Sequence, residues 1–140
     1  MNYLDTSMLT AYYCAEGRSP RVQSVLSHVE GPTISPLVEV EFYCAVARKV
    51  RSGTVSEPTA LHIFAELQRH LAESRFQFVP IQAEQYNLAR EWISRLSTPL
   101  RVLDALHMAV AFSHELCLVT SDVDLARSAR HFGVRHRLIS

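Results

Sequence analysis

Short apolar runs of strand length alternate with helical patterns along the whole chain, and this alternation constrains the fold more than any other sequence feature. Between the runs, apolar residues recur at helical spacing, which predicts helices as the connections. Strands joined by helices pair in parallel and are covered on both faces. We therefore expect residues 1–140 to form a single α/β domain. The predicted strands are at residues 3–4, 33–34, 76–79, 117–120 and 134–139.

Capping residues and prolines set the predicted helix boundaries. Ser-Pro pairs at 19–20 and 35–36 put proline in the favoured first helical turn. The first helix is expected to follow Asp5 and to end near Gly17, and the second to end near Gly31. The helix at 102–114 is apolar nearly all round, so we expect it to be central. The predicted helices begin near residues 6, 19, 36, 56, 82, 102 and 122.

Composition limits the classes of function. Fourteen basic and fourteen acidic residues cancel, so the whole-molecule basic field of many nucleic-acid binders is absent. This counts against RNA as a ligand, although a local basic patch gives the same sum. Three cysteines without metal-like spacing indicate free thiols in a reducing compartment. No run reaches the roughly 20 apolar residues of a membrane span, so we expect a soluble cytoplasmic protein.

Acidic residues stand where strands end and inside two helices. Asp5 directly follows the first predicted strand, and Asp122 follows the strand at 117–120 by one residue. Because ligands of open parallel sheets bind outside the carboxyl ends of the strands, both carboxylates can face one crevice. Glu41 and Asp104 lie within predicted helices, and Asp104 has apolar neighbours. A buried carboxylate needs a partner, which is either a cation or Arg101 three residues earlier.

Clustered carboxylates repel one another, and a divalent cation reverses that repulsion. Oxygen-only ligands without paired His or Cys residues favour a hard ion, Mg²⁺ or in its place Mn²⁺, over zinc. Such ions assist phosphodiester hydrolysis by activating water and by stabilising charge on the attacking and leaving oxygens. The sequence therefore predicts a metal-dependent hydrolase of phosphodiesters.

Simpler structural roles compete at each acid. Asp5 and Asp122 are suitable helix N-caps. Asp104 is placed for an ion pair with Arg101, and Glu41, like Glu39, for a solvated helix face.

The supporting residues have two interpretations as well. Thr6, Ser7 and Thr120 either orient the carboxylates or cap helices and satisfy backbone groups. Asp124 is either a fifth acid of the site or a first-turn charge favoured by the helix dipole. His107, three residues after Asp104, is either close enough to approach the site or a packed helix histidine, and we favour the packed histidine.

Taken in order, four segments resemble the PIN-domain ribonucleases and, among them, the VapC-type toxins of toxin–antitoxin modules. The likeness spans essentially the whole chain. It implies a PIN-like three-layer α/β/α sandwich with a five-stranded parallel sheet, and Mg²⁺-dependent endoribonuclease activity. It also implies a homodimer and a cognate antitoxin whose tail occupies the active-site groove. The matching segments are residues 3–7, 35–42, 100–109 and 119–126, followed by Phe-Gly-Val at 132–134.

The resemblance also assigns roles to residues. The four metal-binding acids of the family match Asp5, Glu41, Asp104 and Asp122. Thr120 matches a hydroxyl residue that hydrogen-bonds within the site.

RNA contact is expected from basic residues near the crevice. These are Arg101 and the group Arg48, Lys49 and Arg51, which the dipole at a helix end explains equally well. Tyr12, Tyr13 and the apolar face of 61–71 indicate either an antitoxin or dimer interface, or part of the core.

Two other functions remain open from the sequence. One is a catalytically silent PIN-like domain that binds RNA or a partner. The other is a metal-dependent phosphatase with an aspartyl nucleophile at Asp5, although such enzymes normally carry a second acid at the place occupied here by Ser7.

Overall fold

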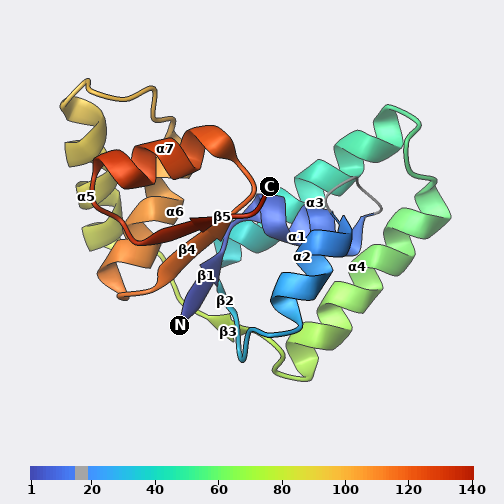
Figure 1. The fold of residues 1–140 in the computed structure, drawn as a ribbon. Coiled ribbons are helices and arrows are strands. Elements are labelled where there is room, and N and C mark those ends of the chain that lie inside the picture. The colour runs from blue at the N-terminus through green and yellow to red at the C-terminus, as the bar shows by residue number, and fades with distance from the viewer. Residues whose placement is uncertain (15–18) are drawn as a thin grey trace.

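A five-stranded parallel sheet forms the centre of the computed structural model, which describes residues 1–14 and 19–140 (Figure 1). The strand order is β3-β2-β1-β4-β5, with Leu4 opposite Val119 and Ile34 opposite Phe78. This arrangement confirms the predicted parallel sheet. The strands are β1 (Asn2–Leu4), β2 (Thr33–Ile34), β3 (Gln77–Phe78), β4 (Cys117–Thr120) and β5 (His136–Leu138).

Helices flank the sheet on both faces and complete the predicted α/β/α sandwich. In Figure 1, α1 to α4 occupy the right of the view, and α5 to α7 the left. α1 packs against α2 and α3, α5 packs against α6, and α7 lies along β4 and β5. The helices of the described residues are α1 (Thr6–Tyr13), α2 (Ser19–Leu26), α3 (Pro36–Arg51), α4 (Glu57–Ala72), α5 (Ala83–Ser94), α6 (Val102–Ser113) and α7 (Val123–His131).

The core confirms the expected central position of α6. All seven residues from Ala105 to Ala111 are buried, as an all-round apolar helix requires. The two middle strands are equally enclosed: Tyr3, Leu4 and Leu118 are fully buried. Each such large side chain contributes about 1.5–3 kcal/mol through removal from water.

Several predicted boundaries were too generous. β3 is two residues long and exposed at the sheet edge, and Pro80, which has no N–H for a ladder, follows close behind it. α2 ends at Leu26 rather than near Gly31. Directly after this end, the hydroxyl of Ser27 donates to the carbonyl of Ser24 and so competes with the backbone N–H groups of the helix for that acceptor. β5 likewise covers less than 134–139.

α1 ends at Tyr13, and the predicted end near Gly17 lies outside the described residues. None of the helices in the described ranges has the length and apolar character needed to cross a membrane.

Candidate active site at the ends of β1 and β4

The chain changes direction across the sheet between β1 and β4. From β1 it builds outward through β2 and β3, and then it crosses to β4 and β5 on the other side. β1 and β4 are therefore neighbours whose following segments diverge, and the carboxyl ends of such strands are where open parallel sheets bind ligands in a crevice. Asp5 directly follows β1, and Asp122 follows β4 by one residue. As predicted, the fold brings these two acids to the same edge of the sheet.

Asp5 is buried and its carboxylate is held by three donors. Ser7 Oγ donates to Oδ1 at 2.6 Å, Thr120 Oγ1 donates to Oδ2 at 2.5 Å, and the backbone N–H of Met8 caps α1 through Oδ1 at 3.2 Å. Burial raises the pKa of Asp5, and the hydrogen bonds from Ser7 and Thr120 counter part of that rise. Asp5 is thus both the N-cap of α1 and a fixed carboxylate at the crevice.

The hydroxyl of Thr120 joins the two strand ends. While donating to Asp5, it accepts the backbone N–H of Asp122 at 2.9 Å. Ser7 Oγ also accepts the backbone N–H of Ser121 at 3.0 Å. The start of α1 and the loop after β4 are therefore locked together by side chains that the sequence could assign only to capping or to support.

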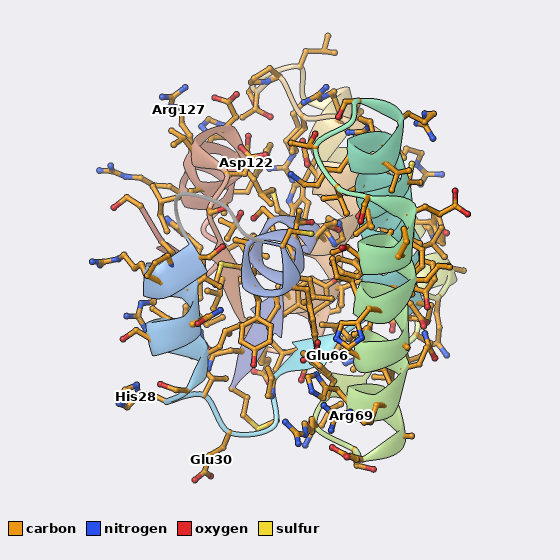
Figure 2. All side chains as sticks on the ribbon, turned by 90° about the vertical axis from the view of Figure 1, so that its right-hand side faces the viewer. His28, Glu30, Glu66, Arg69, Asp122 and Arg127 are labelled. Carbon is orange, nitrogen blue, oxygen red and sulfur yellow. The ribbon has the colours of Figure 1, made fainter. Side chains whose placement is uncertain are left out.

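Asp122 caps α7 in the same way that Asp5 caps α1. Its Oδ1 accepts the backbone N–H groups of Asp124 at 2.9 Å and Leu125 at 3.2 Å. Figure 2 places Asp122 beside α7, at the opposite end of the molecule from Glu30. The capping role is real for both acids, and it coexists with their position at the strand ends.

Glu41 reaches the same region from α3. Its Oε1 accepts hydrogen bonds from Thr6 Oγ1 at 2.8 Å and pairs with His107 Nε2 at 2.5 Å. Burial alone would raise the pKa of Glu41, but the hydrogen bond and charge of His107 and the bond from Thr6 together lower it. Glu39 instead accepts a hydrogen bond from Gln68 of α4 at 2.7 Å. Of these two glutamates, Glu41 joins the neighbourhood of Asp5.

Asp104 lies half-buried in the first turn of α6, and burial and nearby negative charges raise its pKa. Burial raises this pKa most, the charge of Asp122 raises it next, and Glu41 adds a smaller rise. His107 and Arg101 act in the opposite direction without cancelling the rise. The predicted partnership with Arg101 is therefore present but outweighed. The charges of carboxylates on two other segments, Asp122 and Glu41, thus act on Asp104.

The donor set suits a hard cation by its chemistry. It consists of carboxylate oxygens, whose negative charges repel one another around Asp104. A carboxylate that already accepts hydrogen bonds keeps further lone pairs with which it can bind a cation. Within residues 1–14 and 19–140, however, no three His, Cys, Asp or Glu side chains are gathered in a ready ion cage. The residues fit Mg²⁺ or Mn²⁺, but the side chains are not preassembled around an ion position.

The family model of the PIN domain matches residues 3–131. The chain belongs to the PIN-domain family. Among solved structures, the sarcin-ricin-loop-cleaving toxin VapC20 of Mycobacterium tuberculosis has a TM-score of 0.74 at 17% identity, over 91% of this chain and 95% of that one. The DNA-bound VapBC complex of Salmonella typhimurium has a TM-score of 0.67 at 17% identity, over 100% of both chains. PAE2754 of Pyrobaculum aerophilum has a TM-score of 0.60 at 26% identity, over 91% and 86%.

These likenesses establish that the chain has the fold of VapC toxins. No curated protein sequence matches the chain significantly.

The hydrogen-bonding roles of two residues of this PIN domain, His107 and Tyr3, were not predicted from the sequence. His107 is buried and pairs with Glu41, whereas a packed helix histidine was the favoured interpretation. Its Nδ1 lies 2.9 Å from the hydroxyl of Tyr3, which in turn lies 2.8 Å from Ser35 Oγ. One signal was available in the sequence: a tyrosine in a buried strand needs a partner for its hydroxyl.

Asp124, the candidate fifth acid, is not drawn into the crevice. Its side chain is 77% exposed and forms an ion pair with Arg127 at 3.4 Å on the same helix. The interpretation as a first-turn charge of α7 describes it better.

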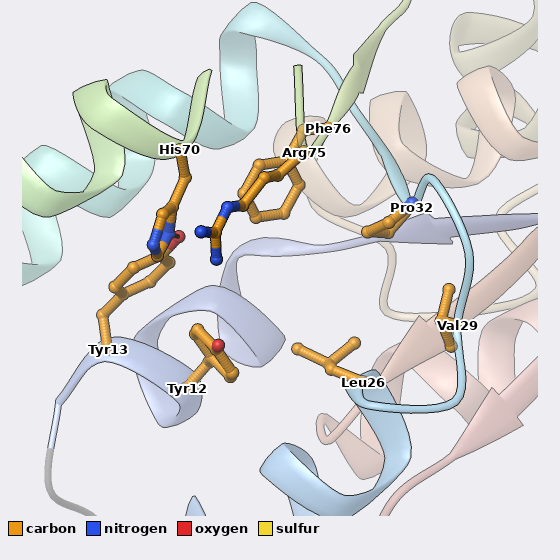
Figure 3. Close-up of a pocket in the computed structure, with 8 residues that line it drawn as sticks. All are labelled: Tyr12, Tyr13, Leu26, Val29, Pro32, His70, Arg75 and Phe76. Carbon is orange, nitrogen blue, oxygen red and sulfur yellow. Dashed lines mark hydrogen bonds between the residues drawn. The ribbon is translucent and has the colours of Figure 1, made fainter. Parts of the chain in front are cut away.

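A hollow of about 140 Å³ lies at the far end of α1 from Asp5 (Figure 3). Tyr12 and Tyr13 line it together with His70 and Arg75, and none of the four acids does. Tyr13 also packs edge-on against the buried Phe42, so part of this aromatic surface belongs to the core. The candidate active site and this hollow are separate features of the PIN domain.

Proposed function

We propose that this PIN domain is a Mg²⁺-dependent endoribonuclease that acts as the toxin of a toxin–antitoxin module. The observation that carries the proposal is the contact of Thr120 Oγ1 with both the Asp5 carboxylate and the backbone N–H of Asp122, which holds the two strand ends together. The pKa of Asp104 is raised by burial and, next, by the charge of Asp122. Acids whose pKa values are raised by burial and by neighbouring like charges are typical of functional sites. Membership of the PIN family supports the same conclusion.

Each acid has a defined place in the proposed site. Asp5, Glu41, Asp104 and Asp122 would hold the cation, with Mn²⁺ as a substitute for Mg²⁺. When bound, the ion would supply Lewis-acid stabilisation of the phosphate and a water activated for attack. Ser7 and Thr120 fix the carboxylate of Asp5 through their hydroxyls. Such outer hydrogen bonds keep a ligand oriented and are needed for full metal affinity.

Substrate contact is proposed for the basic residues near the crevice. Arg101 stands at the N-cap position of α6, three residues before Asp104, where its charge already acts on that carboxyl. Arg48, Lys49 and Arg51 form the last turn of α3 and would contact phosphates farther along an RNA strand. Their charge offsets the repulsion between the acids and the RNA backbone.

Similar solved structures support the proposed partners. VapBC of Salmonella typhimurium is a DNA-bound complex, and VapC20 is described as a toxin that cleaves the sarcin-ricin loop. We propose a cognate antitoxin, a homodimer and a cytoplasmic location for this chain, where both RNA and antitoxin are available. The aromatic surface formed by Tyr12, Tyr13 and the apolar side of α4 is the proposed interface for one of these proteins.

The decisive test compares two glutamates of the same helix. Purified protein, freed of any partner, is incubated with total cellular RNA and Mg²⁺ or Mn²⁺, and the new RNA ends are sequenced. Glu41→Gln and Asp104→Asn should lose cleavage, whereas Glu39→Gln, whose carboxylate contacts Gln68 instead, should retain it.

Three outcomes contradict the proposal. Undiminished cleavage by Asp104→Asn rejects the site. Absence of cleavage by the folded wild type favours a silent binding domain. Hydrolysis of a phosphomonoester but not of RNA favours a phosphatase.

A further inference from the structure

A buried chain of hydrogen bonds runs from the end of β2 to the candidate site. Ser35 Oγ contacts the hydroxyl of Tyr3 at 2.8 Å, and that hydroxyl contacts His107 Nδ1 at 2.9 Å. His107 Nε2 then contacts Glu41 Oε1 at 2.5 Å. Tyr3 and Ser35 are fully buried and His107 is 3% exposed, so bulk water does not compete for the bonds among these three residues. The Glu41 side chain at the end of this chain of bonds is 21% exposed. The chain connects β2, β1, α6 and α3.

The chemistry of the groups gives these bonds a direction. The carboxylate of Glu41 can only accept, so His107 Nε2 donates to it. Where Nδ1 carries no proton it accepts from the Tyr3 hydroxyl, which accepts from the Ser35 hydroxyl; where Nδ1 is protonated it donates to Tyr3 instead, and in both cases Nε2 donates to Glu41. Ser35 Oγ also accepts the backbone N–H of Val38 as the cap of α3. The side-chain polar atoms of Ser35, Tyr3 and His107 all have partners, which fixes the ring orientation of His107.

Glu41 depends on this arrangement for its position. Its side chain is long and partly exposed, and without a partner it has several rotamers available. Both hydrogen bonds that hold it, from Thr6 and from His107, end on Oε1. Further acceptor capacity, including that of Oε2, is left for a cation.

The chain contains a similar histidine away from the site. His70 is 4% exposed, and its Nδ1 lies 2.6 Å from the hydroxyl of Tyr13. Figure 3 shows this pair side by side at the hollow that contains none of the four acids. His70 therefore shares the burial and the tyrosine partner of His107, but the carboxylate that its Nε2 approaches, Glu66 at 3.9 Å, is not one of the four acids.

We infer that His107, oriented by Tyr3, is a positioning residue that holds the Glu41 carboxylate in place for a divalent cation. The inference rests on the proposed function, because it assigns a role within the same site. His107 neither touches substrate nor binds the ion. It limits the freedom of a ligand that would otherwise have to be ordered when the ion binds.

The test measures Mn²⁺ affinity by calorimetric titration of the metal-stripped full-length protein. His107→Leu removes the donor and should weaken Mn²⁺ binding by about 10- to 100-fold, the usual cost of losing an outer partner of a metal ligand. Tyr3→Phe removes one hydroxyl and should give a smaller loss. His107→Gln retains an N–H donor and should recover part of the affinity. His70→Leu should bind Mn²⁺ like the wild type, even where its melting temperature falls.

The outcomes separate this inference from the proposal beneath it. Mn²⁺ binding that is absent in the wild type, or unaffected by Asp122→Asn, rejects the metal site and the inference with it. If Asp122→Asn abolishes binding but His107→Leu binds within twofold of the wild type, or more tightly, only the inference fails. Should His107→Leu not fold, wild-type affinity in both His107→Gln and Tyr3→Phe overturns the inference.

Discussion

Replacing Thr120 by valine tests the junction between the two strand ends most directly. Valine has nearly the same shape, so the change removes a hydroxyl without opening a cavity. Two bonds are lost: the donation to Asp5 at 2.5 Å and the acceptance of the Asp122 N–H at 2.9 Å. A hydrogen bond to a charged group contributes about 1.5–3 kcal/mol, and a buried N–H left without an acceptor costs about 1–3 kcal/mol.

Because the two effects share one side chain and are not additive, we expect Thr120→Val to lose about 3 kcal/mol of unfolding free energy at pH 7. Urea titration followed by circular dichroism measures this loss. Thr120→Ser keeps the hydroxyl and should lose only about 1 kcal/mol, the contribution of one buried methyl group. A loss below about 1 kcal/mol in the valine variant, or an equal loss in both variants, would refute the reasoning.

The loss should also depend on pH. Burial holds the pKa of Asp5 above its ordinary value of 3.8, and the bond from Thr120 acts in the opposite direction because it stabilises the ionised form. The stabilisation from this bond is therefore present where Asp5 is ionised and is lost as pH falls through its pKa. The stability gap between wild type and Thr120→Val should narrow on the acid side, whereas the part due to the Asp122 N–H should persist.

Two further variants test the acids individually. Asp104→Asn should stabilise the metal-free protein at pH 7 by less than about 1 kcal/mol. Burial and the charge of Asp122 raise the pKa of Asp104, and partial exposure screens the effect on stability. The gain should disappear in thermal melts at acid pH, where wild-type Asp104 is protonated in both the folded and the unfolded state. Asp122→Ala should lose about 1 kcal/mol of unfolding free energy because it removes the cap of α7. Asn is also a good N-cap, so Asp122→Asn should keep most of that stability and still lose RNA cleavage. If Asp122→Asn cleaves RNA as well as the wild type, the role of Asp122 is capping alone.

The positions of Asp5 and Asp122 could be predicted because they depend on short-range patterns and one rule of topology. Strand-length apolar runs followed by capping residues locate the strand ends, and parallel pairing brings those ends to one edge. Glu41 and Glu39 required more than that. Two residues apart on a helix means about 200° of rotation, so the glutamates point in different directions, and the packing of α3 decides which one meets Thr6.

The role of His107 lay beyond the sequence for a related reason. Its two partners are 66 and 104 positions away along the chain, so no local pattern connects them. Inside an apolar helix, a histidine next to a carboxylate and one that is merely packed have the same neighbours in sequence. The lengths of α2 and β3 were overestimated for a similar reason. The hydroxyl that competes for a carbonyl after α2 and the exposed position of β3 at the sheet edge are features of the folded chain.

Three helices begin at the acidic cluster: Asp5 caps α1, Asp122 caps α7, and Asp104 occupies the first turn of α6. Each helix N-terminus carries a partial positive charge of roughly half an elementary unit, contributed by its unpaired backbone N–H groups. The partial positive charges of the backbone thus offset part of the repulsion between the carboxylates, with or without a bound ion. We therefore expect the chain to fold in the absence of divalent ions, so that folding and binding of the proposed cation would be separate events.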